Sequence, residues 1–296
     1  MKKVSLIGAS GFVGRNLYEH LAKQPEKYAL SGTYFSNPSN SQFHQLDIRN
    51  SVDLERYILG ESPDVILWLS GKRAPDLDKN YSFTLDVQVK PLIDLVGILE
   101  RNKSHTKVLY FSTDNVFGGA RGQYEERDST SPKSNYGKSR ALSEQLLLGS
   151  PLDVKVARLS AVMGKGGVFF DFILNSLRAG KREKCFNDLY FSPTPVGLVN
   201  DAVTEIIENW DSTPNKILHL SGGQRMSRHY FASMLAEMSS HDRALIEAAS
   251  KFSNVGKQSE VSLFGNDTSL VPSEVVKELL KRRSFRGYLE AELQRA

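Results

Sequence analysis

Short apolar segments alternate with amphipathic segments along the first half of the chain. The segment 63–71 contains a continuous apolar run bounded by proline and glycine, which is typical of a strand that is buried on both faces of a sheet, and 107–113 is predicted to be the next buried strand. The predicted strands are 3–7, 28–34, 42–46, 63–71, 107–113 and 153–160, and the predicted helices are 12–21, 51–59, a long helix across 85–99, and one after Ser134. This alternation predicts an α/β fold with a doubly wound parallel sheet.

The pattern changes beyond Gly164. Here the sequence predicts helices at 168–177 and 198–210, a proline pair within 191–197, one short strand at 216–222, and further helices. We therefore expect two parts, a doubly wound α/β domain over 1–163 and a smaller, mostly helical lobe over 164–296 that covers the strand ends and would bind the substrate, between which the chain is free to cross back. Ligands of such sheets bind at the carboxyl ends of the strands, so a site is expected in the loops after Ile7, Leu69, Phe111 and Leu159.

Composition narrows the class of protein. With 296 residues, of which 40% are hydrophobic, the chain can bury a sizeable core. The single cysteine, Cys185, permits no internal disulfide and no cysteine metal cluster, and the histidines show no spacing typical of metal ligands. A net charge of +4 suits phosphate-bearing ligands, but no dense basic stripe indicates a nucleic-acid partner. No signal peptide and no apolar stretch of about 18 residues is recognised, so we expect a cytoplasmic protein without a membrane span.

The stretch "LIGASGFVG" places three glycines between the first strand and the first helix. Gly8 permits a tight turn, Gly11 lets the backbone approach a pyrophosphate, and Gly14 allows the helix to pack closely on the strand. The turn therefore predicts a Rossmann-type dinucleotide site. The residues expected to bind the cofactor are Gly8, Ser10, Gly11, Phe12, Val13, Gly14, Ser36, Asp47, Ile48, Ser70, Gly71, Tyr136 and Arg140.

The second strand ends without the carboxylate that usually binds the adenosine ribose. Its absence removes a repulsion that would exclude a 2'-phosphate, and Ser36 or Asn37 could donate hydrogen bonds to such a group. This favours NADP(H), while NAD(H) stays open. Asp47, in "QLDIRN", either accepts a hydrogen bond from an adenine amino group or lies at the start of the following helix.

Several further motifs appear in a fixed order: "LDIRN" (46–50), "FSTDNVFGG" (111–119), "SPKSNYGKSR" (131–140), "ARLSAVMG" (157–164) and "NDLYFSPTPVGLVNDAV" (187–203). Together with the glycine turn they resemble the extended short-chain dehydrogenases/reductases, and within them the dTDP-4-dehydrorhamnose reductase-like group of sugar-nucleotide enzymes. The resemblance covers nearly the whole chain.

The resemblance implies roles for three residues. Thr113 would polarise the substrate carbonyl, Tyr136 would donate its phenolic proton as hydride arrives, and residue 140 would bind the nicotinamide ribose and stabilise the phenolate. Positions 136 and 140 share one helix face, and the start of a helix favours an anion. The family carries lysine at the last position, whereas Arg140 keeps the charge but replaces a compact ammonium with a planar fork. A second departure is Asp86, where the family usually carries asparagine.

Asn115 bears on the type of reaction. Related 4,6-dehydratases carry aspartate and then glutamate after the threonine, but here Asp114 is followed by Asn115, which favours carbonyl reduction over dehydration. The resemblance thus implies an NAD(P)-dependent reductase of a 4-keto nucleotide sugar. It is also compatible with a homodimer. Two alternatives stay open. One is a non-catalytic NADP-binding regulatory protein, because this fold group includes a regulatory partner of methionine adenosyltransferase, and the other is an epimerase that retains NAD tightly.

Overall fold

The computed structural model describes residues 1–38, 40–71, 80–251 and 266–296. The chain forms two compact units. The first comprises Met1–Val116, Ser134–Arg158 and Thr204–Leu218, and the second comprises Phe117–Lys133, Leu159–Val203 and His219–Ala296. The sequence led us to expect a division near residue 163 with the chain free to cross back, and the chain does cross between the two units several times. That the second unit binds the substrate stays a prediction.

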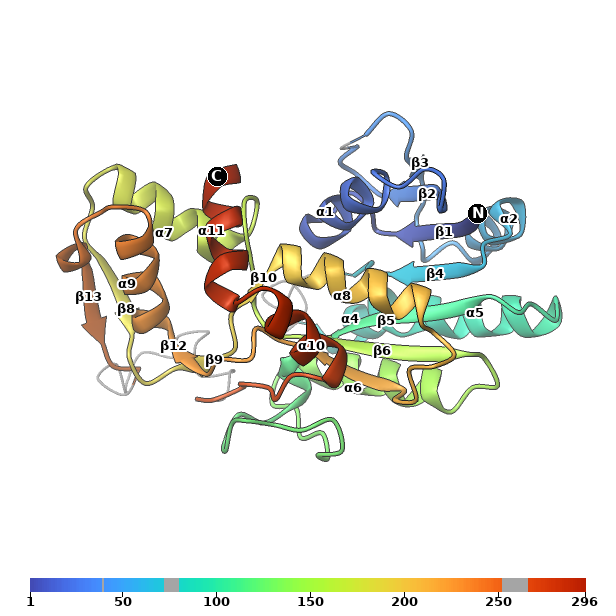
Figure 1. The fold of residues 1–296 in the computed structure, drawn as a ribbon. Coiled ribbons are helices and arrows are strands. Elements are labelled where there is room, and N and C mark those ends of the chain that lie inside the picture. The colour runs from blue at the N-terminus through green and yellow to red at the C-terminus, as the bar shows by residue number, and fades with distance from the viewer. Residues whose placement is uncertain (39, 72–79, 252–265) are drawn as a thin grey trace. The chain divides into compact units, whose positions relative to one another are not determined.

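A seven-stranded sheet forms the centre of the first unit (Figure 1). Its strands, in spatial order, are β11 (Ile217–Leu220), β6 (Val154–Leu159), β5 (Lys107–Thr113), β4 (Val65–Trp68), β1 (Lys2–Ile7), β2 (Tyr28–Tyr34) and β3 (His44–Gln45). Parallel pairing joins β3, β2, β1, β4 and β5, with Ile7 opposite Trp68 and Trp68 opposite Tyr110. The predicted Rossmann-type sheet is confirmed. The order along the sheet reverses between β1 and β4, which makes this the switch point where ligands of such folds bind.

The helices of this unit follow the predicted order, with one correction. They are α1 (Phe12–Leu21), α2 (Ser51–Glu61), α4 (Tyr81–Gln88), α5 (Lys90–Arg101) and α6 (Asn135–Leu148). The long helix expected across 85–99 is two helices, which break at Val89. Pro91 is the reason, because proline has no N–H and its ring clashes with the preceding turn, so it is accommodated in the first turn of α5.

Helices α2, α5 and α6 cover one face of the sheet. Between them and the strands lies an apolar cluster that includes Trp68, Leu92, Tyr110 and Leu147, all at most 2% exposed. The crossover from β3 back to β4 runs opposite to that from β1 to β2, and right-handed crossovers therefore place α2 and α1 on opposite faces. Both faces of the central strands are thus buried, which explains the apolar runs 65–69 and 108–111.

Helix α6 is held to the sheet by polar contacts. Glu144 on α6 and Arg158 on β6 form an ion pair in which each side chain is 3% exposed. The guanidinium donates from Nη2 to Oε2 at 2.7 Å and from Nε to Oε1 at 3.1 Å, and Ser112 on β5 also donates to this carboxylate. Because buried charges require close partners, this arrangement fixes the position of α6 against β5 and β6.

The second unit contains helices and small two-stranded sheets. Its helices are α7 (Val168–Arg178), α9 (Arg228–Met238), α10 (Glu274–Arg282) and α11 (Phe285–Arg295), and α8 (Val196–Glu208) leads back into the first unit. Its paired strands are β8 (Glu183–Phe186) with β13 (Ile246–Ala249), β9 (Tyr190–Phe191) with β12 (Met226–Ser227), and β7 (Val162–Met163) with β10 (Thr194–Pro195). Its core includes Phe170, Phe191 and Phe231, and burial raises the pKa of the Cys185 thiol to about 11. In the described ranges, every helix is too short or too polar to cross a membrane.

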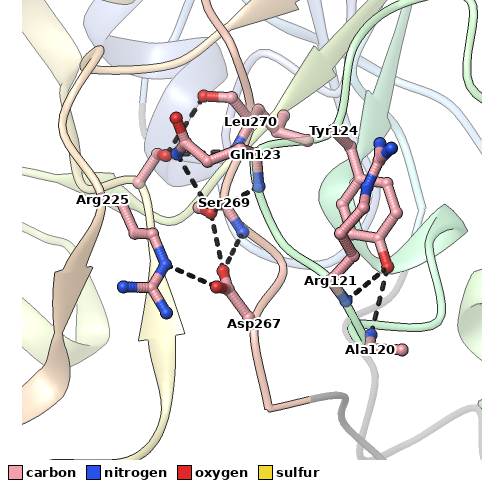
Figure 2. Close-up of polar contacts among 9 residues, drawn as sticks. Ala120, Arg121, Gln123, Tyr124, Arg225, Asp267, Ser269 and Leu270 are labelled. Atoms are coloured by element: carbon pink, nitrogen blue, oxygen red, sulfur yellow. Dashed lines mark hydrogen bonds and ion pairs between the residues drawn. The ribbon is translucent and has the colours of Figure 1, made fainter.

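Asp267 links its own segment of the second unit to Arg225, which lies far from it in the sequence (Figure 2). Its carboxylate accepts from Arg225 Nε at 2.5 Å and from Ser269 Oγ at 2.6 Å. Ser269 Oγ in turn accepts from the backbone N–H of Gln123 at 2.8 Å, next to the bridge between Tyr124 and Leu270. These contacts tie the loop that follows "STDNV" to the segment that leads into α10.

Breaking the buried ion pair between Glu144 and Arg158 should destabilise the fold strongly. Glu144→Ala removes the charge that compensates Arg158 in a buried place, so we expect a loss of about 3–5 kcal/mol in the free energy of unfolding. Denaturant titration followed by circular dichroism measures this loss. The control is Glu278→Ala, which removes an exposed partner of Lys281 and should leave the midpoint nearly unchanged. Equal effects of the two substitutions would contradict the prediction.

A second prediction concerns pH. Glu292 on α11 is 2% exposed, and burial raises the pKa of its carboxyl above the ordinary 4.5, against the opposing effects of Arg295 and the Gly197 N–H. As pH rises, the carboxyl of the unfolded chain loses its proton near pH 4.5, whereas that of the folded chain keeps its proton to a higher pH. The free energy of unfolding therefore falls as pH rises through the folded pKa of Glu292.

Glu292→Gln should remove this cost while keeping an acceptor for the Gly197 N–H, which donates to Oε1 at 3.1 Å. The melting temperature of the variant relative to the native protein should increase between pH 4.5 and pH 7.5. The matched control is Glu274→Gln, in which Lys277 holds the pKa of the native carboxyl below its usual value, so the opposite trend is expected. A difference that does not change with pH would rule out the proposed origin.

Candidate functional site

The turn between β1 and α1 requires glycine at its first position. Gly8 has φ +92°, and a Cβ there would lie 2.9 Å from the Cα and N atoms of Ser70, just after β4. The N–H of Gly8 donates to Thr33 Oγ1 at 3.0 Å. The loops that follow β1 and β4 therefore lie against each other at the switch point, and Thr33 on β2 holds the turn in place.

Close packing also requires glycine at position 14. A Cβ on Gly14 would lie 2.5 Å from the carbonyl oxygen of Gly8 and 2.9 Å from the Cα of Ala9. Helix α1 begins after Gly11, whose N–H donates to the Gly8 carbonyl at 3.2 Å and which has no side chain to cap the helix. Backbone N–H groups in the first turn of a helix without such a cap can bind a phosphate, with help from the helix dipole. The turn thus fits a pyrophosphate.

Asp47 follows β3, the edge strand of the sheet, and its carboxylate binds Arg49. Arg49 Nε donates to Oδ1 at 2.9 Å and Nη2 donates to Oδ2 at 2.6 Å, and these bonds hold the pKa of Asp47 below its usual value. The Arg49 guanidinium also lies over the ring of Phe35, 5.4 Å from its centroid. Ser36 is exposed and Ile48 is 8% exposed. A contact of Asp47 with adenine stays a prediction.

Thr113 ends β5 and is 7% exposed. Its hydroxyl donates to Asp114 Oδ1 at 3.1 Å and accepts from the side chain of Asn115 at 3.0 Å. Asn115 is thus an amide donor to Thr113. The hydroxyl is held at the carboxyl end of β5, where its donor can be redirected to an incoming carbonyl oxygen.

Tyr136 and Arg140 lie one turn apart on α6, as predicted from their spacing. Ser134 caps this helix and accepts from Gly137 N at 3.0 Å, which places Tyr136 in the first turn. The Arg140 guanidinium lies over the Tyr136 ring, 5.3 Å from its centroid. Arg140 Nη1 donates to the carbonyl oxygen of Phe111 at 3.2 Å, two residues before Thr113. All three predicted site residues therefore belong to the junction of α6 and β5.

The Arg140 guanidinium is 6% exposed and almost enclosed by protein. Burial lowers the pKa of Arg140, but interactions with Tyr110 and Tyr136 raise it above its ordinary value, so the group stays charged. Gly71 has φ +143°, and a Cβ there would lie 2.6 Å from Nη2. Nε is buried and, among the described residues, has no hydrogen-bond acceptor. A buried donor with no acceptor fits a bound group that supplies a hydroxyl, such as a ribose.

Sequence reasoning missed three residues near this site. Tyr110 binds Arg140, Gln88 lies beside Gly71, and Arg49 engages Asp47. Only Arg49 had a local signal, because it lies two residues from Asp47 in "LDIRN". Asp86, which the resemblance led us to expect near the site, is exposed on α4, and its charge acts on Arg49. Within the described ranges, no group of histidine, cysteine and carboxylate side chains could hold a metal ion.

The model of the RmlD substrate binding domain family matches residues 1–268. The chain belongs to this family. Among its relatives, the spore coat polysaccharide biosynthesis protein SpsK of Bacillus subtilis is 32% identical over 262 residues, which cover 85% of this chain and 84% of that protein. A dTDP-4-dehydrorhamnose reductase of Aggregatibacter actinomycetemcomitans is 28% identical, over 78% of this chain and 77% of that one. Methionine adenosyltransferase 2 subunit beta of Bos taurus is 24% identical, over 83% and 76%.

A solved structure shares the fold over almost the entire chain. The dTDP-4-dehydrorhamnose reductase of Bacillus anthracis, solved in complex with NADP, superimposes with a TM-score of 0.80 at 19% identity, covering 99% of this chain and 98% of that one. At this identity the likeness establishes the architecture alone. Membership of the family and the architecture agree with the resemblance found in the sequence motifs.

Two Gly→Ala substitutions, one in the glycine turn and one in α2, should have opposite effects on stability. In Gly14→Ala the new methyl group would overlap the Gly8 carbonyl, so we expect a lower melting temperature. Gly60, near the end of α2, has open space where a Cβ would lie. Gly60→Ala should therefore stabilise the protein by about 0.5–1 kcal/mol, because alanine loses less backbone entropy in a helix. Thermal unfolding measures both, and a neutral Gly14→Ala would show that the turn is not closely packed.

Proposed function

We propose that the protein is an NAD(P)-dependent reductase of a 4-keto nucleotide sugar, in which Arg140 takes the place of the family's lysine. The observation that carries the proposal is the placement of the Arg140 guanidinium over the Tyr136 ring, at the end of the strand that bears Thr113. A proton donor, a buried cation beside it and a carbonyl-binding hydroxyl thus come from one helix and one strand. Family membership and the reductase relative support the same activity.

The proposed cofactor site combines the glycine turn with the loop after β4. Gly8, Gly11 and Gly14 would receive the pyrophosphate, and Nε of Arg140 would donate to the nicotinamide ribose. NADP(H) is favoured over NAD(H) because no carboxylate lies at the end of β2, and because the related Bacillus anthracis reductase was solved with NADP. When bound, the reduced nicotinamide supplies the hydride.

The protein's own groups handle the proton. As the carbonyl carbon gains hydride, its oxygen gains the phenolic proton of Tyr136, so that C=O becomes CH–OH and a phenolate remains. The charge of Arg140 stabilises this phenolate in a place with little water, and the phenolate then recovers its proton from solvent. Thr113 would donate to the same carbonyl oxygen and orient it. Dehydration would also need a base beside Thr113, where the structure has the amide of Asn115.

A regulatory role is the second candidate. It is favoured by the 24% identity to methionine adenosyltransferase 2 subunit beta over most of both chains. Such a protein would bind the cofactor without turning over a sugar, and Arg140→Lys would not restore activity. An epimerase, in contrast, would retain tightly bound NAD after purification, whereas a reductase must exchange its cofactor in each cycle.

The test begins with fluorescence titration of NADPH and NADH and continues with their oxidation in the presence of a panel of 4-keto nucleotide sugars. We expect turnover with at least one sugar, and Tyr136→Phe should lower kcat by about 10²–10⁴-fold because the proton donor is lost. Cofactor affinity should change little, since the phenyl ring remains.

The matched control is Tyr230→Phe, which removes a hydroxyl from an exposed tyrosine on α9 in the second unit. Its turnover should equal that of the native protein. Tight cofactor binding without turnover of any sugar, unchanged in Arg140→Lys, would overturn the reductase and support the regulatory protein.

A further inference from the structure

Tyr110 is a buried tyrosine that none of the family motifs assigns to the site. It lies in the middle of β5, is 0% exposed, and accepts from Arg140 Nη1 at 3.0 Å. The Arg140 guanidinium also lies 5.6 Å from the centroid of the Tyr110 ring. A single cation is therefore held between two phenols, with Tyr110 on the sheet and Tyr136 on the helix.

In the described ranges, no carboxylate neutralises the charge of Arg140. Within the described part of the chain, Arg140 forms no ion pair, and its polar partners are the Tyr110 hydroxyl, the Phe111 carbonyl and Tyr136. Burial raises the pKa of the Tyr110 hydroxyl, despite the opposing effect of Arg140, so this phenol stays neutral. The positive charge thus remains available to the second phenol, that of Tyr136.

The geometry also explains how an arginine fits where the family has lysine. A planar fork on a longer stem needs more space and more than one anchor. Nη1 is anchored by Tyr110 and by the Phe111 carbonyl, and Nη2 occupies the space that a side chain at position 71 would fill. Nε is buried and has no acceptor among the described residues. The pocket therefore fixes the orientation of the fork as well as its position.

We propose that Tyr110 is a positioning residue, which holds the Arg140 guanidinium against Tyr136 so that arginine can perform the role of the family's lysine. Gly71 completes the pocket by leaving room for Nη2. The proposal rests on the proposed function, since the role of Arg140 is to stabilise the Tyr136 phenolate and to hold the nicotinamide ribose. Tyr110 itself touches neither substrate nor cofactor and acts only through Arg140.

The test is a double-mutant cycle with Tyr110→Phe, Arg140→Lys and the double variant. In Tyr110→Phe we expect kcat to fall about tenfold or more and NADPH to bind severalfold more weakly, by fluorescence titration, since a misplaced fork loses both roles. The alkaline limb of the pH profile of kcat should move to higher pH, because the misplaced cation stabilises the phenolate formed in the reaction less. In the Arg140→Lys background, Tyr110→Phe should change each quantity by less than about twofold.

Two further variants separate positioning from general damage. Tyr57→Phe removes another largely buried hydroxyl in the same unit, one that bonds to Ser5 at 2.8 Å and Ser31 at 3.1 Å, and it should leave kcat, the pH profile and NADPH affinity unchanged. Gly71→Ala disturbs the guanidinium from the opposite side and should shift the same pH limb in the same direction. It keeps the proposal testable should Tyr110→Phe fail to fold.

The outcomes distinguish the two proposals. If the effects of Tyr110→Phe and Arg140→Lys multiply independently, or if Tyr110→Phe leaves the pH profile and NADPH affinity unchanged, Tyr110 does not act through Arg140. If no sugar is reduced but the two substitutions remain coupled in NADPH affinity, the reductase fails while the positioning role stands. If the native protein binds neither NADPH nor NADH, both are overturned.

Discussion

The attachment of α6 to the sheet by buried polar groups is the constraint on which the site depends. Most helices that cover a sheet are held by an apolar stripe, which tolerates small shifts along the strand direction. Here Glu144 and Arg158 form a buried ion pair near one end of α6, and Arg140 binds the β5 backbone nearer the other. Hydrogen bonds to buried charges tolerate little displacement, because an unpaired charge in such a place is costly. Tyr136 is therefore fixed relative to Thr113.

The glycine turn applies a different constraint to the same edge of the sheet. Gly8 and Gly14 are required because backbone atoms of β1, α1 and the loop after β4 approach closely enough to leave no room for a Cβ. Because Gly11 precedes α1, no side chain caps the first N–H groups of the helix. Steric exclusion therefore shapes the proposed pyrophosphate site, whereas polar anchoring shapes the proposed reaction centre.

Arg140 connects these two regions. Its fork reaches from α6 past the Phe111 carbonyl to the space beside Gly71, in the loop after β4. A lysine ammonium has three donors on a flexible stem and no fixed plane. A guanidinium is planar, so its neighbours must fix the orientation of that plane. The orientation of the Arg140 fork is set by specific surroundings, namely Tyr110 on the strand and a glycine with φ +143°.

The sequence by itself determined the order of strands and helices, the glycine turn and the pairing of Tyr136 with Arg140, because these depend on local periodicity, backbone conformation and spacing along one helix. It also indicated the family. The break at Val89 was missed although Pro91 is a local signal for it. The sequence did not reveal the roles of Tyr110 and Gln88. These residues lie in apolar or helical segments where nothing local marks them. Only the tertiary structure, which brings β5, α4 and the loop after β4 around one guanidinium, decided that they surround the site.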